Sequence, residues 1–191
     1  SRQFDISKID FDLLSREFAH TRRKNLLLRD LDELVNQQLS KMLFANPQRI
    51  DYYDRYQEII DAYNAEQNRA TIEKTFMDLM ELASSLDTEQ QRYVREGFSS
   101  DEELSVYDLL FSENLTKQEI ETIKKVSVDL LTKIKQQIAK LDHWTDKQET
   151  KAIVDNLIRK TLWQELPNSY DVNDIQTYQK KIYEYVYMRY P

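Results

Sequence analysis

The sequence has few of the residues that form tight turns and reactive sites. Among 191 residues there are one glycine, three prolines, two histidines and no cysteine. Phosphate-binding loops and dinucleotide-binding folds need several glycines, so both are excluded. Without cysteine there is no disulfide, thiolate nucleophile or cysteine-based zinc site, which fits a reducing compartment. With only His20 and His143, far apart in sequence, we expect no catalytic, cofactor-binding or metal-ligating residue in this chain.

Long apolar runs and a basic excess are also missing. No run approaches the length of a membrane helix, and the N-terminus lacks a signal-peptide pattern, so we expect a cytoplasmic protein without membrane contact. The formal net charge of −7 argues against a general nucleic-acid-binding surface, although a local basic patch stays open. Because the chain begins at Ser1 without methionine, we expect it to be a fragment of a larger protein.

Apolar residues recur three and four positions apart through most of the chain, which predicts helices. We therefore predict an all-α fold, a bundle of about eight or nine antiparallel helices with short connections. Gly97 stands where a helix end needs a left-handed residue, and it marks a boundary between lobes of residues 1–96 and 97–191. Ser99 with Glu102, and Thr116 with Glu119, read as capping boxes that begin the next two helices.

The most distinctive stretch is a helical corner at residues 42–64. One helix should end before Pro47, since proline disfavours helical geometry in the residue before it, here Asn46. Asp51 is placed as the cap of the next helix. Aromatic and aliphatic side chains of that helix then recur on one face, and we expect the aromatics after Asp51 to be interface candidates. These candidates are Tyr52, Tyr53 and Tyr56.

The last helix carries a second stripe of tyrosines, Tyr183, Tyr187 and Tyr190, beside its apolar stripe. A helix that is apolar on two sides is either central in a bundle or half of an interface. Tyrosine suits an interface because its large ring ends in a polar hydroxyl, but it also suits a partly wet core edge. Both interpretations stay open from the sequence.

Two acidic patterns could suggest chemistry. Asp101, Glu102 and Glu103 together read as the first turn of a helix, where the helix dipole stabilises negative charge. Glu149 and Lys151 have the Glu-x-Lys spacing of many metal-dependent nucleases, but those residues normally project from a strand, where positions i and i+2 face one way. A helix splays them, so we expect a structural role for both patterns.

Four ordered motifs resemble one known family. They are FDLLSREF at residues 11–18; NPQRIDYY at 46–53 with IIDAYN at 59–64; REGFSSDEELSVYDLL at 95–110; and DHW at 142–144. They are similar to motifs of the C-terminal helical region of the restriction and motor subunit (R subunit) of type I restriction–modification enzymes. Phe98 stands where the family usually has leucine, and residues 188–191 match the family's ending only loosely. Trp144 belongs to the last motif, and we expect it to be structural, as we do Asn46, Pro47, Asp51 and Gly97.

The resemblance implies a function for the parent subunit and a narrower one for this chain. The parent carries a metal-dependent nuclease domain and an ATP-driven DNA translocase, so ATP and Mg²⁺ are implied for the parent and none for this fragment. The helical region is similar to the part that packs on the motor domains and docks onto the modification (methyltransferase) subunit. This implies a non-catalytic assembly and coupling domain that meets DNA only through the parent complex.

Two alternatives come from other functional classes. The first is a DNA-contacting helical element beside the motor, which needs lysines and arginines from separate helices to converge. The second is a protein-interaction adaptor unrelated to restriction.

Overall fold

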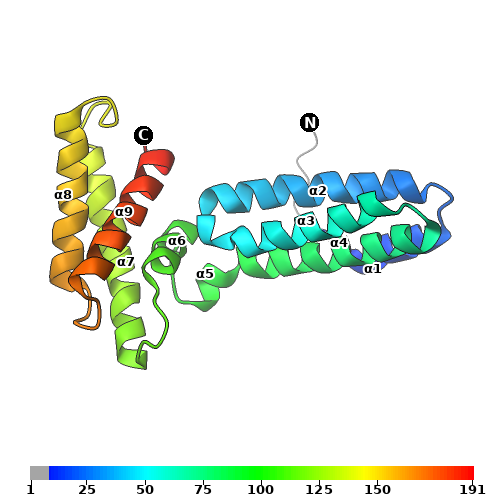
Figure 1. Ribbon diagram of the computed structural model, residues 1–191, viewed down its shortest axis with the longest axis horizontal. Coiled ribbons are helices and arrows are strands. Elements are labelled where there is room, and N and C mark those ends of the chain that lie inside the picture. Colours follow the sequence, from blue (N-terminus) through cyan, green and yellow to red (C-terminus); the bar gives the residue numbers. More distant parts are fainter. Residues whose placement is uncertain (1–8) are drawn as a thin grey trace. The chain divides into compact units, whose positions relative to one another are not determined.

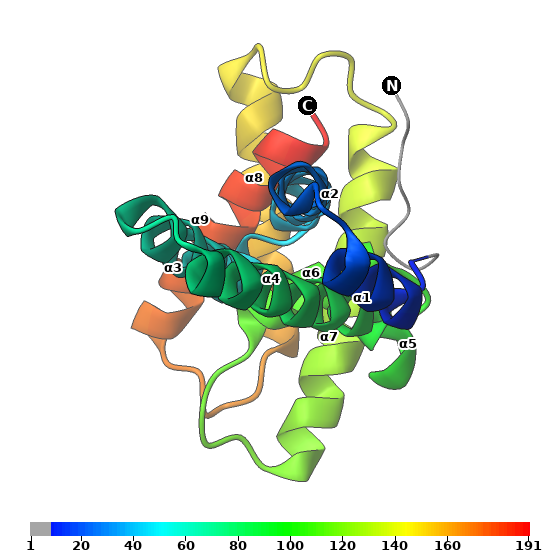
Figure 2. The same cartoon turned by 90° about the vertical axis from the view of Figure 1, so that its right-hand side faces the viewer.

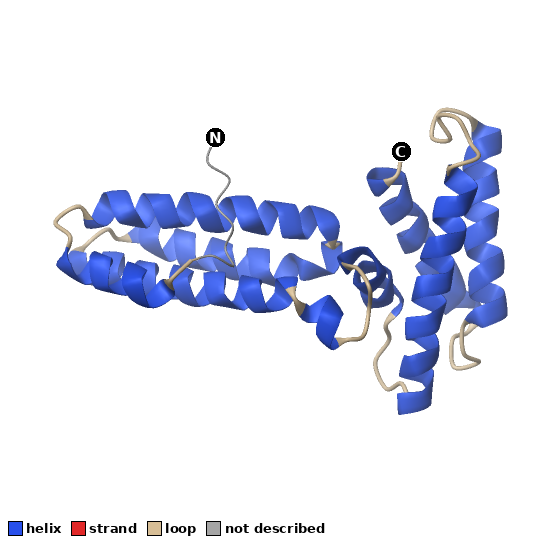
Figure 3. Ribbon diagram, turned by 180° about the vertical axis from the view of Figure 1, so that it is seen from behind, coloured by secondary structure: helices blue, strands red, loops and turns tan. Residues whose placement is uncertain are grey.

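The computed structural model describes residues 9–191, and in them the chain forms α-helices and a short 3₁₀ helix but no strand (Figure 1; Figure 3). The all-α prediction is confirmed. The chain divides into two compact units, residues 1–92 and 93–191, and each has its own hydrophobic core. The division falls between Arg92 and Tyr93, a few residues before the boundary that we expected at Gly97.

The described part of the first unit has four α-helices and one 3₁₀ helix. They are α1 (Phe11–His20), α2 (Lys24–Ala45), η2 (Pro47–Arg49), α3 (Ile50–Ala65) and α4 (Arg69–Gln90). Helix α4 packs against both α2 and α3, and Figure 2 views this group nearly end on. Val35 of α2 and Phe76 and Leu79 of α4 are fully buried where the helices meet. The ring of Phe18 stacks on that of Phe76, with 3.7 Å between centroids, and so joins α1 to α4.

The second unit is a bundle of four longer helices. After the single turn α5 (Arg92–Arg95) come α6 (Asp101–Leu110), α7 (Lys117–Ile138), α8 (Gln148–Glu165) and α9 (Val172–Arg189). Helix α7 packs on α6 and α8, and α9 packs on the same two helices, so the bundle closes on itself. Ile123, Leu130 and Ile134 of α7 are fully buried. Ser127, between them, is satisfied by donating its hydroxyl to the Ile123 carbonyl at 2.7 Å.

The helix ends show where sequence patterns fix the backbone. Gly97 has φ +85°, the left-handed conformation predicted for it, and its N–H donates to the Val94 carbonyl. The Phe98 N–H donates to the Tyr93 carbonyl, which completes a Schellman motif. The capping box of Thr116 and Glu119 is confirmed.

The other predicted capping box is wrong by one position. Ser100, rather than Ser99, caps α6 by accepting from the Glu103 N–H, and the Glu103 carboxylate accepts from the Ser99 N–H. The turn that follows Gly97 is one residue longer than the sequence pattern suggests. The capping serine and its glutamate are therefore each one position later in the sequence than predicted. The acidic run at Asp101 lies in the first turn of α6, as expected for a helix start.

Candidate interaction site

The corner between α2 and α3 is built around Asn46 and Pro47. Helix α2 ends at Ala45, as predicted from Pro47, which takes the first position of η2. Asn46 is fully buried, and its side-chain oxygen accepts from the Gln48 N–H at 3.1 Å. The prediction that Asp51 caps the next helix is wrong, because Asp51 lies inside the first turn of α3. Asn46 caps the inserted 3₁₀ helix, and α3 itself follows from Arg49 without a side-chain capping bond.

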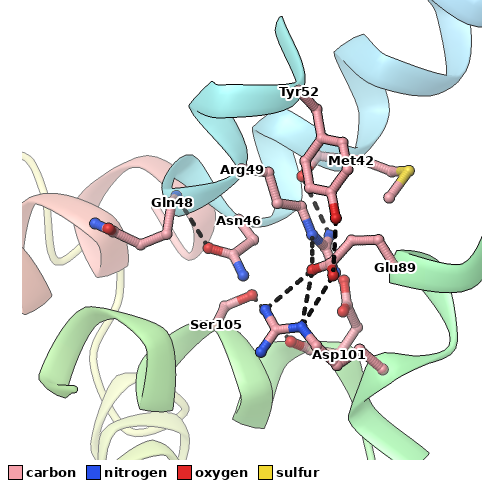
Figure 4. A network of polar contacts seen from close by, with 9 residues as sticks. Met42, Asn46, Gln48, Arg49, Tyr52, Glu89, Asp101 and Ser105 are labelled. Atoms are coloured by element: carbon pink, nitrogen blue, oxygen red, sulfur yellow. Dashed lines mark hydrogen bonds and ion pairs between the residues drawn. The ribbon is translucent and has the colours of Figure 1, made fainter. Parts of the chain in front are cut away.

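A buried charge network lies at the same corner, and the sequence analysis missed it. The Arg49 guanidinium, whose side chain is 2% exposed, contacts Glu89 of α4 with 3.2 Å between Nε and Oε1. Arg49 also donates to the Met42 carbonyl, at 3.3 Å. Arg92 binds both oxygens of Glu89, at 3.0–3.1 Å, and the Tyr52 hydroxyl donates to the same carboxylate at 3.4 Å (Figure 4).

The Glu89 network sets the ionisation of its members. Burial opposes the charge on Glu89, but hydrogen bonds and positive charge from Arg92 and Arg49 outweigh it and hold the Glu89 pKa below its ordinary value. Burial and the Glu89 charge raise the pKa of Tyr52. We call Arg49, Glu89 and Arg92 the ion triad. Arg49 and Glu89 lie 40 residues apart in sequence, so no local motif could have revealed their pairing.

The three tyrosines after Asp51 differ in how far they are buried. Tyr56 is buried in the core of the first unit, so its ring is not exposed at the surface. Its hydroxyl donates to Asp32 at 2.6 Å and accepts from Asn36 at 3.1 Å, and burial with the Asp32 bond raises the Tyr56 pKa to about 12. Tyr52 is half-buried in the Glu89 network, and only Tyr53, 39% exposed, faces solvent.

The second unit holds an aromatic cluster that consists of Trp144, Tyr183, Tyr187 and Tyr190. Trp144 is 1% exposed and follows His143, which has a left-handed φ of +46°. The rings of Tyr183 and Tyr187 meet the indole edge on, at 6.1 and 5.8 Å. The indole N–H donates to the backbone carbonyl of Tyr190.

Tyr190 links this aromatic cluster to α6 and α7. Its hydroxyl donates to Glu102, which also pairs with Lys135 at 2.8 Å. The Lys135 ammonium lies 5.5 Å from the centre of the Tyr190 ring. Burial and the bond to Glu102 raise the Tyr190 pKa, so this hydroxyl stays protonated. Tyr190 therefore makes contacts with Trp144, Glu102 and Lys135.

The tyrosine stripe of α9 is mainly internal to the second unit. Tyr183 and Tyr190 are half-buried, whereas Tyr187 is 38% exposed and its neighbour Met188 is 61% exposed. The two interpretations of the stripe thus apply to different residues. Tyr183 and Tyr190 form a core edge, and Tyr187 with Met188 forms a surface patch, which we call the Tyr187 patch.

The Glu149 and Lys151 pattern lies on a helix rather than a strand. Glu149 and Lys151 lie in the first turns of α8, a helix as expected. Across residues 9–191, no three or more His, Asp or Glu side chains are grouped so that they could hold a metal ion. Over the same residues, no helix combines the length and apolar character needed to cross a membrane.

Comparison with known proteins assigns the chain to a family. The model of a protein family described as type I restriction enzyme HindI endonuclease subunit-like, C-terminal, matches residues 1–189. No curated protein and no solved structure matches the chain. The family match covers both units, and it confirms the resemblance drawn from the four motifs.

Proposed function

Because this chain belongs to the type I restriction enzyme HindI endonuclease subunit-like C-terminal family, we propose that it is a non-catalytic assembly and coupling domain. In this role it docks the endonuclease subunit onto the modification (methyltransferase) subunit and packs against the motor domains of its own subunit. ATP and Mg²⁺ then serve the parent's catalytic domains. Family membership removes the alternative of an adaptor unrelated to restriction.

The observation that supports docking is the Tyr187 patch. Large apolar side chains that stay exposed beside a rigid core are the usual centre of a protein interface. Tyr187 and Met188 meet this description, since Tyr187 rests edge on against the buried Trp144. A tyrosine whose ring is already fixed loses little conformational freedom when a partner covers it.

The proposal is tested by measuring binding of the purified chain to the modification subunit of the same restriction system, by titration calorimetry. We expect a complex, and we expect the double substitution Y187A/M188A to weaken it by about tenfold or more, as for an interface hot spot. Met77→Ala is the matched control, because Met77 of α4 is 58% exposed, close to the 61% of Met188. M77A should bind like the unsubstituted chain.

Two results would overturn the proposal. One is the absence of any complex with the modification subunit while both proteins are folded. The other is cleavage of plasmid or hydrolysis of ATP by the purified chain in the presence of Mg²⁺, since a coupling domain has neither activity.

A further inference from the structure

The solvent face of α8 combines an exposed tryptophan with unpaired positive charge. Trp163 is 50% exposed, and none of the ring contacts in residues 9–191 involves it. Arg159 and Lys160 lie four and three residues before it, so both are exposed on the adjacent turn of the same face. We call Arg159, Lys160 and Trp163 the α8 face.

Three lysines of the neighbouring helix α7 are paired with carboxylates. There Lys124 pairs with Glu96, Lys133 with Asp129 and Glu165, and Lys135 with Glu102. Within the described chain, neither Arg159 nor Lys160 contacts a carboxylate. Arg159 donates only to the neutral side chain of Asn156, at 3.5 Å. Positive charge is therefore left over on this face of an acidic protein.

The two carboxylates that flank these residues in sequence have other partners. Glu165, two residues after Trp163, pairs with Lys133 of α7 at 3.1 Å. Asp155 is the only acidic residue between positions 152 and 164, and it accepts a hydrogen bond from Gln179 of α9 at 3.0 Å. It is thus turned toward the α8–α9 seam. Between residues 156 and 164, α8 carries two positive charges, an indole ring and neutral side chains.

We propose that the α8 face binds single-stranded nucleic acid, with one unpaired base stacked on Trp163 and the adjacent phosphates held by Arg159 and Lys160. Stacking on an aromatic ring needs a base that is free of its duplex partner, and it is tolerant of sequence because every base has a π-face. Lysine and arginine beside the ring supply the contacts to the backbone. An acidic protein surface would use the two charges but would leave the flat face of the indole without a matching group.

This surface is separate from the Tyr187 patch. Trp163 is near the C-terminal end of α8, and a short loop joins α8 to the start of α9. Tyr187 is at the other end of α9. Substitutions on one surface therefore leave the other intact, and failure of this inference is distinguishable from failure of the docking proposal.

The test is fluorescence anisotropy of a labelled 20-nucleotide oligothymidylate titrated with this chain at several salt concentrations. We expect binding at low salt that quenches tryptophan emission, because Trp144 is buried and Trp163 is the accessible indole. Trp163→Ala should weaken binding about tenfold, the loss of roughly one stacked base. R159A/K160A should weaken it and lower the slope of log K against log salt by about 1.4, or roughly 0.7 for each lost phosphate contact.

Matched controls separate recognition from net charge. K117A/K180A removes the same charge from exposed positions on α7 and α9, and it should leave the affinity within about twofold. Trp163→Phe keeps a ring for stacking, so it should bind better than Trp163→Ala while the quenching disappears. Circular dichroism confirms that each variant is folded.

Three results would overturn the inference. The first is no binding of oligothymidylate at low salt. The second is equal loss in K117A/K180A and R159A/K160A, which would mean that charge alone acts. The third is equally tight binding and quenching with polyglutamate, which would assign the face to acidic proteins.

Discussion

The two units solve the same packing problem with different chemistry. The first unit buries charge at its helical corner, where Glu89 pairs with Arg49 and with Arg92. The second unit buries rings, with Trp144 against Tyr183 and Tyr187 and a hydrogen bond from its indole to Tyr190. We therefore expect the loss of one partner to lower the unfolding free energy of either unit, but for a different physical reason in each. In the first a buried charge loses its shared carboxylate, and in the second a cavity opens.

The two tryptophans allow the stability of the two units to be measured separately. Both of them, Trp144 and Trp163, lie in the second unit. Tryptophan emission therefore follows unfolding of the second unit, whereas far-ultraviolet circular dichroism follows helices of both. Urea titrations read by both signals assign a loss of stability to one unit.

The largest effect is expected from Trp144→Ala. Removing a fully buried indole leaves a cavity and breaks its bond to the Tyr190 carbonyl, so the second unit should lose about 3–5 kcal/mol of unfolding free energy. Trp163 reports the transition in the variant. As a control, Trp163→Ala removes the same side chain from an exposed site and should cost well under about 1 kcal/mol. Equal losses in the two variants would contradict the buried role of Trp144.

In the first unit, Glu89→Gln should cost about 3 kcal/mol, because the buried Arg49 and its neighbour Arg92 both lose the carboxylate that they share. The circular dichroism transition should move while tryptophan emission keeps its midpoint. Glu73→Gln is the matched control, since the exposed Arg69–Glu73 pair has almost the same separation, 3.3 Å against 3.2 Å. Exposed pairs contribute about 0–1 kcal/mol, so this variant should be nearly neutral.

The ion triad also predicts a dependence on pH. The Glu89 pKa is lowered in the folded state, so its stabilising contribution is present above the unfolded value of about 4.3 and is lost as the pH falls through the folded value. The stability gap between the unsubstituted chain and Glu89→Gln should therefore narrow in urea titrations from about pH 7 to pH 3. A gap that stays constant would show that Glu89 does not titrate with folding.

A smaller effect is expected from Tyr56→Phe. The substitution removes the hydroxyl that bonds Asp32 and Asn36 but keeps the ring, so the first unit should lose about 1–2 kcal/mol. Tyr53→Phe, one turn away and exposed, should change stability by less than about 0.5 kcal/mol. A reversed order in the circular dichroism transitions would contradict the buried position of Tyr56.

The smallest effect is expected from Gly97→Ala, at about 1 kcal/mol. An added Cβ would meet no atom within 4 Å, so the cost comes only from holding alanine at φ +85°. Gly97→Asn should cost less, because asparagine tolerates the left-handed region better. Tryptophan emission should report both losses, since the turn belongs to the second unit. A larger cost for asparagine would point to crowding rather than backbone strain.

Local patterns predicted most of the fold, and distant pairings account for what they missed. Pro47, Gly97 and the Thr116 capping box act within a few residues, so sequence alone placed them correctly. Asp51 failed as a cap because a 3₁₀ turn between Pro47 and Arg49 shifted the start of α3, which residue types alone do not reveal. Helical spacing put Tyr52 and Tyr56 on one face, but which face turns inward depends on α2 and α4. The Arg49–Glu89 pairing likewise exists only once α4 has packed on this corner.

The anchoring of Tyr190 has a mechanical consequence. The last turn of α9 is fastened through its carbonyl to Trp144 and through its hydroxyl to Glu102, which Lys135 also holds. A force that separates α9 from the bundle at that end would act first on two hydrogen bonds. They are the bond from the Trp144 indole to the Tyr190 carbonyl and the bond from the Tyr190 hydroxyl to Glu102, and both would have to break before the apolar packing separates. The second unit is thus reinforced at the end of α9 where the Tyr187 patch lies, so a load entering through that patch would be shared among α6, α7 and the Trp144 turn.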